Sequence, residues 1–97
     1  MTEEMFHAVV DKAGCTKGDG GRLELPDGST MTLYLAHDGT QLQVSRVTAL
    51  AQKGDIVETH NAKGETFLLA LEDLFAASIV GGDAQDGGAG RKAGFLG

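Results

Sequence analysis

The chain has very few cysteine, proline and aromatic residues: one Cys, one Pro, one Tyr, four Phe and no Trp in 97 residues. The single thiol, Cys15, excludes an internal disulfide and a zinc site built on paired cysteines. Such cysteine usage is typical of a reducing compartment, so we expect a cytoplasmic protein. No apolar run approaches the roughly 20 residues that cross a bilayer, and the first residues lack the features of a signal peptide, so we expect no membrane insertion.

Basic residues are also scarce, with eight Lys and Arg against fourteen Asp and Glu, which gives a net charge of −6. The bases of residues 1–80 are scattered singly along the sequence: Lys12, Lys17, Arg22, Arg46, Lys53 and Lys63. Phosphate binding needs such residues clustered on one face. The charge pattern therefore disfavours a nucleic-acid partner.

Glycine is abundant, and it concentrates in two segments. Residues 14–21 contain four glycines and no apolar periodicity, so we expect a flexible joint there. Residues 81–97 contain seven glycines, and Phe95 and Leu96 are their only large apolar side chains. Such a segment buries too little surface to offset the entropy of ordering. We therefore expect one domain over residues 1–80 and a disordered tail over residues 81–97.

The first residues predict a helix over residues 3–13. Thr2 stands where an N-cap belongs, acidic residues occupy the first turn, and Gly14 stands at the C-terminal stop. The apolar residues recur at spacings of three and four and form one stripe: Met5, Phe6, Val9, Val10 and Ala13. Two interpretations are open, because the stripe can pack on the domain's own sheet or dock on another chain.

From Arg22 onward the apolar residues alternate with polar ones, and turn signals recur every eight to twelve residues. The pattern predicts a mainly β fold, a small antiparallel barrel or roll of five to six short strands. Within residues 41–50 the alternation changes phase around Ser45 and Arg46, which predicts a β-bulge or a sharp bend. A bend of that kind lets a short sheet curl over on itself.

The last part of the domain is the most apolar. Both faces of a strand over residues 67–71 are apolar, so we expect this strand at the centre of the sheet or covered on its second face, with the N-terminal helix as one candidate for the cover. A single helical turn near Glu72 then leads to a final strand over residues 75–80. The alternative is one continuous helix over residues 71–79.

Nothing in the sequence predicts catalysis, a metal site or a cofactor. Three histidines and Cys15 are the only soft or borderline ligands, and their spacing matches no metal motif. The serines lack a Gly-x-Ser-x-Gly context. We therefore expect a protein that is not an enzyme.

The function that these features favour is a non-catalytic protein-interaction or regulatory module. A domain with a small core and open sheet edges is stabilised when it self-associates or binds a protein partner. The predicted partner-binding residues lie on the helix and in the tail: Met5, Phe6, Val9, Val10, Arg91, Lys92, Phe95 and Leu96. The alternative is a barrel that binds a small ligand or a nucleic acid through Arg22, Tyr34 and Arg46.

In outline, the predicted layout resembles small barrels of the SH3, Sm and PilZ kinds, and this resemblance of shape implies no function. The arginine-rich signature by which PilZ domains bind a cyclic dinucleotide is absent, since Arg22 and Arg46 stand alone.

Overall fold

A computed structural model describes residues 1–81 as one helix, seven strands and two 3₁₀ turns. Their bounds are α1 (Glu3–Ala13), β1 (Thr16–Lys17), η1 (Asp19–Gly21), β2 (Leu23–Glu24), β3 (Thr30–His37), β4 (Thr40–Lys53), β5 (Ile56–Asn61), β6 (Thr66–Ala70), η2 (Leu71–Asp73) and β7 (Leu74–Val80). The prediction of a mainly β fold with an N-terminal helix is confirmed. The predicted disordered tail lies, from Gly82 on, outside the described residues.

Helix α1 begins and ends where its capping residues predict. The Thr2 hydroxyl accepts a hydrogen bond from the Met5 amide at 3.1 Å, and Gly14 ends the helix in the left-handed conformation with φ of 73°. Phe6, Val10 and Ala13 are buried against the sheet. The helix is too short to span a membrane, and it is the only α-helix in the described part of the chain.

The strands form one antiparallel sheet that curls because β4 is long and bent. Strand β4 pairs with β3 from Thr40 to Val47, and from Val47 on it pairs with β5 on one side and, at Ala49 and Leu50, with β2 on the other. Arg46 has a φ of 58°, and both ladders shift register beside it, which confirms the predicted bend. The hairpin before it turns through Asp38 and Gly39, whose φ angles of 49° and 80° are typical of a type I′ turn.

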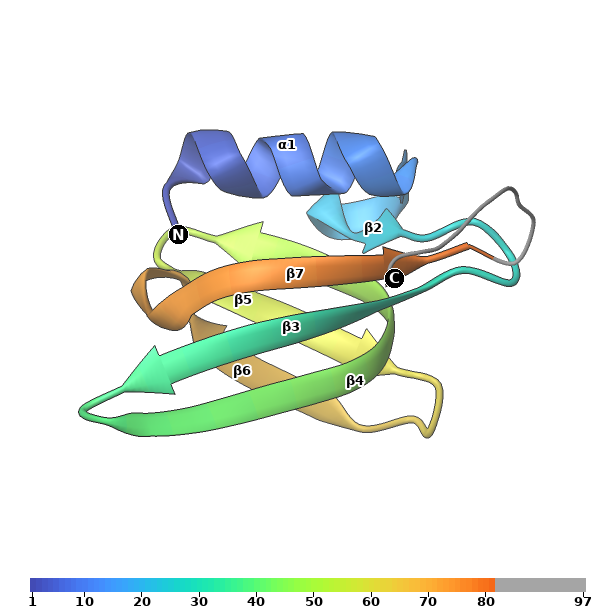
Figure 1. Cartoon of the computed structure of the whole chain (residues 1–97). Helices are drawn as coiled ribbons and strands as arrows, with labels where there is room; N and C mark the ends of the chain where they lie inside the picture. Colours follow the sequence, from blue (N-terminus) through green and yellow to red (C-terminus); the bar gives the residue numbers. More distant parts are fainter. Residues whose placement is uncertain (82–97) are drawn as a thin grey trace.

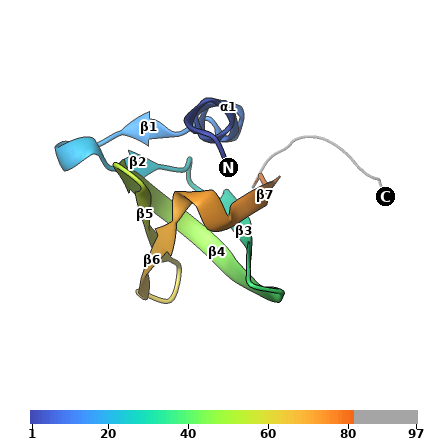
Figure 2. The same ribbon diagram turned by 90° about the vertical axis from the view of Figure 1, so that its left-hand side faces the viewer.

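The bend divides the sheet into two layers that share β4 (Figure 1). One layer holds β7, β3 and the first half of β4, and the other holds β2, the second half of β4, β5 and β6. The layers diverge and leave two openings, so the sheet is a half-barrel. Helix α1 lies across one opening, and the end view shows the opposite opening between β6 and the β3–β4 hairpin (Figure 2).

The core lies between the layers and beneath α1. Met31, Leu33 and Leu35 point into it from β3, as the alternation predicts, and Phe6 enters it from the helix. Thr59 is the only buried polar side chain among the described residues, and its hydroxyl donates to the Phe67 carbonyl at 3.3 Å. This buried hydroxyl therefore has a hydrogen-bond partner, as buried polar groups generally do.

Two sequence expectations need correction. Residues 14–21 are not a featureless joint, because they form β1 and η1, and β1 pairs with β2. Strand β6 is neither central nor covered by α1: within residues 1–81 it pairs only with β5, and Leu68 at its centre is 70% exposed. The ending of the domain is as first expected, since η2 is one helical turn and β7 is a strand, which rules out the continuous helix.

Candidate functional site

The opening opposite α1 is an apolar cleft between β6 and the first half of β4. Two hollows follow each other along these strands, with volumes of about 400 Å³ and about 390 Å³. Apolar side chains from both layers line them: Leu35, Leu42, Val44, Phe67 and Leu69. We call this region the open cleft.

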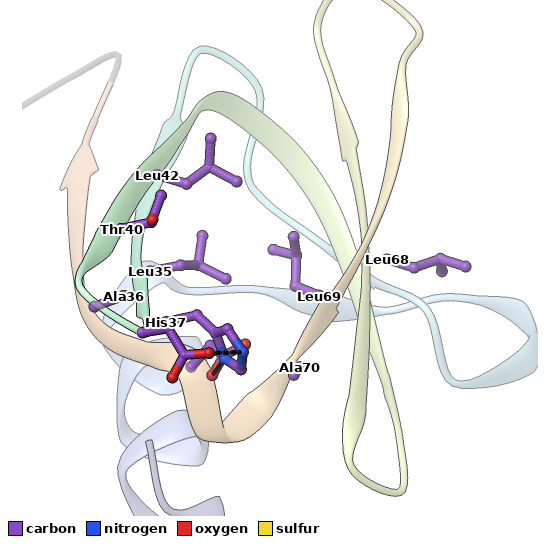
Figure 3. Close-up of a pocket in the computed structure, with 10 residues that line it drawn as sticks. Leu35, Ala36, His37, Thr40, Leu42, Leu68, Leu69 and Ala70 are labelled. Atoms are coloured by element: carbon purple, nitrogen blue, oxygen red, sulfur yellow. Dashed lines mark hydrogen bonds and ion pairs between the residues drawn. The ribbon is translucent and has the colours of Figure 1, made fainter.

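The side chains at the first hollow come from three elements (Figure 3). Leu35 on β3, Leu42 on β4 and Leu69 on β6 point toward one another, whereas Leu68 points away from them. Leu35 and Leu69 are buried, but Leu42 remains 56% exposed because nothing among the described residues covers it. A large apolar side chain that is exposed beside a hollow marks a surface whose burial by a partner lowers the free energy.

An ion pair between His37 and Asp73 lies at the mouth of the first hollow. His37, at the end of β3, places Nδ1 3.1 Å from an Asp73 carboxylate oxygen in η2 and Nε2 3.4 Å from an Asp38 carboxylate oxygen. The hydrogen bond with Asp73 and the negative charge of that carboxylate raise the pKa of His37. With Glu72 nearby, three carboxylates surround one imidazole, so this end of the cleft is acidic.

The second hollow, at the other end of the cleft, is more polar. Arg46 and Lys63 line it together with Glu65 and Asn61, and Phe67 continues the apolar floor. The Asn61 side chain accepts from the Lys63 and Glu65 amides, which fixes the β5–β6 turn. The cleft is therefore mainly apolar in the first hollow, with an acidic mouth there, and mainly polar with mixed charge in the second hollow.

Strand β6 adds an unprotected edge to this cleft. Soluble proteins commonly protect edge strands with charged residues, proline or bulges. Residues Thr66–Ala70 have none of these, because their sequence is TFLLA and their ladder with β5 is regular. The backbone edge of β6 that faces away from β5 is thus able to accept a further strand.

A second polar group lies outside the cleft, on the outer face of β5 and β6. His60 Nε2 is 3.2 Å from Glu58, His60 Nδ1 is 3.1 Å from the Thr66 hydroxyl, and Lys53 is 3.2 Å from Glu58. The contact with Lys53, and to a lesser degree that with His60, lowers the pKa of Glu58. These side chains line neither hollow of the cleft, so they form a cross-strand ladder on the sheet surface.

The structure separates the residues predicted for partner binding. Phe6 and Val10 lie in the domain's own core, Val9 is half-buried, and Met5 is 46% exposed. Most of the helix stripe is therefore already covered within the chain, which agrees with the first of the two interpretations. The tail residues Arg91, Lys92, Phe95 and Leu96 lie outside the described residues.

The residues of the predicted ligand site are not brought together. Arg22 pairs with Glu24 at 3.3 Å, and Arg46 lines the polar end of the open cleft. Tyr34 lies on the outer face of β3, where its hydroxyl is 3.3 Å from Ser78 and its ring is 6.4 Å from that of Phe75. These three residues therefore share no hollow.

Other candidate sites are weaker. Among residues 1–81 no three His, Cys, Asp or Glu side chains are grouped to hold a metal ion. Cys15 is half-buried, and burial raises the pKa of its thiol, which lowers its reactivity. A third hollow of about 470 Å³ lies between α1 and the β1–β2 hairpin, and both apolar side chains (Phe6, Val10, Leu23) and charged ones (Asp11, Lys17) line it.

Sequence reasoning missed the open cleft, although one signal for it was present. The apolar residues on both faces of β6 predicted a covered strand, and the alternative cause of such a pattern is an edge strand that another chain covers. No protein family, curated protein or solved structure matches the chain.

Proposed function

We propose that the protein is a non-catalytic protein-interaction module that binds an extended segment of a partner protein in the open cleft. The partner segment adds as a strand to the free edge of β6 and places alternate side chains on the apolar floor. The observation that carries the proposal is that Leu35, Leu42 and Leu69 line an open hollow beside the edge of β6 that no other described strand pairs with, where Leu42 is 56% exposed.

The side of the half-barrel that α1 covers indicates which kind of side chain the open cleft accepts. Phe6 and Val10 of α1 enter the core through the first opening and are 2% and 8% exposed. The open cleft offers a floor of the same chemistry in Leu35, Leu42 and Leu69. A partner with two apolar side chains on one face therefore covers it as α1 covers the opposite side.

Strand addition is favoured over a partner helix because β6 also offers backbone groups. Its five residues carry no charge that would repel an incoming strand and no proline that would remove a donor. Backbone hydrogen bonds then supply affinity, and the side chains that enter the cleft supply specificity.

The charges of the cleft set the composition of the partner segment. Asp38 and Asp73 line the first hollow. Glu72 lies near enough to add to the effect of Asp73 in raising the pKa of His37, which is the only base among the described residues that line this hollow. We expect the partner segment to carry Lys or Arg next to its apolar residues, because opposite charges steer association and fix orientation.

The test is selection from a displayed peptide library on the full chain, followed by measurement of the dissociation constants of the selected peptides. Two variants are compared: Leu42→Ser removes an apolar side chain that is 56% exposed and lines the cleft, and Phe75→Ser removes one that is 51% exposed and lies on the outer face. Covering the exposed half of a leucine contributes about 1–1.5 kcal/mol. We therefore expect about tenfold weaker binding by the Leu42→Ser chain, and unchanged binding by the Phe75→Ser chain.

The proposal is wrong if selection yields no peptide, or if the peptides bind both variants equally. It is also wrong if the selected peptides are acidic, since the rim of the first hollow would repel them. Neither substitution disturbs the core, because both side chains are more than half exposed.

A further inference from the structure

The same chain contains a segment with the composition expected of the partner, basic residues next to apolar ones. Among residues 82–97 the only bases are Arg91 and Lys92, and the only large apolar residues are Phe95 and Leu96. Ala93 and Gly94 separate the two pairs, so bases and apolar residues lie within one short segment. We propose that residues 90–96 occupy the open cleft of their own chain and compete with the partner; this inference rests on the function proposed above.

The chemistry of the two surfaces is complementary. Phe95 and Leu96 match the floor formed by Leu35, Leu42 and Leu69. Arg91 and Lys92 match the acidic mouth, where the Asp38 side chain is 91% exposed and free to approach a base. The described residues carry twelve Asp and Glu against six Lys and Arg, so the domain as a whole attracts the two bases.

The length of the chain allows this contact. Phe95 lies fourteen positions after Gly81, the last described residue, and an extended chain of that length reaches about 46–50 Å. The longest dimension of the structure is 35 Å. Because a short tether between two binding groups gives effective concentrations of about 1 mM, even a weak contact with a dissociation constant near that value fills a large part of the clefts.

Competition by the tail has a measurable consequence. An outside peptide must displace residues 90–96, so its apparent affinity falls by the fraction of clefts that are already filled. For a segment with an intrinsic dissociation constant of about 0.1–1 mM, the Phe95→Ser, Leu96→Ser chain is expected to bind that peptide about 2–10 times more tightly. The tail thus raises the apparent dissociation constant of the partner.

Paramagnetic relaxation in the full chain tests the contact directly. Cys15→Ala removes the native thiol, and Ala93→Cys then carries a nitroxide label beside the two pairs. We expect the amide signals of Leu42, Leu69 and Ala70 to broaden strongly, and the broadening to disappear when Phe95→Ser and Leu96→Ser are added. A label at Ala84→Cys, before the segment, is the matched control, and it is expected to broaden those signals much less.

Two results would overturn the inference. One is that the label at position 93 broadens the cleft signals no more than the label at position 84. The other is broadening that arises only between a labelled chain and an isotope-enriched unlabelled chain, which would place the segment on a second copy.

Failure of the inference and failure of the proposed function are distinguishable. If the nitroxide leaves the cleft signals unchanged while outside peptides still bind through Leu42, the tail inference is wrong and the proposed function stands. If no outside peptide binds even the Phe95→Ser, Leu96→Ser chain, the proposed function is wrong, and the tail has no partner binding to regulate.

Discussion

Replacing Phe6 by alanine tests whether α1 is a structural part of the half-barrel. The Phe6 side chain is 2% exposed and fills the opening that the helix covers. A buried Phe→Ala substitution costs about 3–5 kcal/mol, and a domain of this size has a free energy of unfolding of about 4–12 kcal/mol. We therefore expect the variant to lose between about a quarter and all of its stability.

The assay is urea unfolding of the full chain followed by far-ultraviolet circular dichroism. With a urea dependence of about 1 kcal/mol per molar for a small domain, the midpoint is expected to fall by about 3–5 M, or the variant is unfolded without urea. Met5→Ala is the matched control on the same helix, because Met5 is 46% exposed, and its midpoint is expected to shift by less than 0.5 M or so, about the effect of a surface substitution. The reasoning is refuted if the two variants unfold at the same urea concentration.

Two further predictions concern local features. The hydrogen bond with Asp73 and its negative charge raise the pKa of His37 in the folded chain. The stabilisation from this pair is therefore fully present when the pH is below the pKa of His37 in the unfolded chain, and it is lost as the pH rises through the pKa of His37 in the folded chain. Titration of the His37 ring by nuclear magnetic resonance is expected to show a lower pKa in the Asp73→Asn chain, and an unchanged pKa would contradict the ion pair. Arg46 has a φ of 58° at the β4 bend, so Arg46→Gly is expected to raise the free energy of unfolding by about 0.5–1 kcal/mol and Arg46→Val to lower it by about 1–2 kcal/mol, both measured by urea unfolding. Equal stability of these two variants would show that the left-handed conformation carries no strain.

The elements of the fold follow largely from local signals in the sequence. Thr2 and Gly14 fix both ends of α1, because each satisfies backbone groups that the helix leaves unpaired. The phase change beside Arg46 predicts the bend, because strand side chains alternate with a period of two, which only an irregularity can shift. These signals depend on neighbouring residues alone and need no knowledge of the tertiary arrangement.

The candidate site depends on tertiary arrangement, and that is why sequence analysis did not find it. Leu35, Leu42 and Leu69 are ordinary inward-facing residues of three strands, and only the divergence of the two layers leaves them beside an opening. Leu68 belongs to a strand whose apolar pattern is the same at the centre of a sheet and at an edge awaiting a partner. His37 and Asp73 lie 36 positions apart, so their pairing at the mouth of the cleft could not be predicted.

The most direct test of the account is amide hydrogen exchange in the full chain with and without a library-selected peptide. If the peptide adds as a strand in the open cleft, it slows amide exchange at those residues of β6 (66–70) whose N–H groups point away from β5. The exchange rates of the β7 amides stay unchanged. Protection at β7 in place of β6, or no protection at either strand under saturating peptide, would contradict the proposal that the open cleft and its free edge form the binding site.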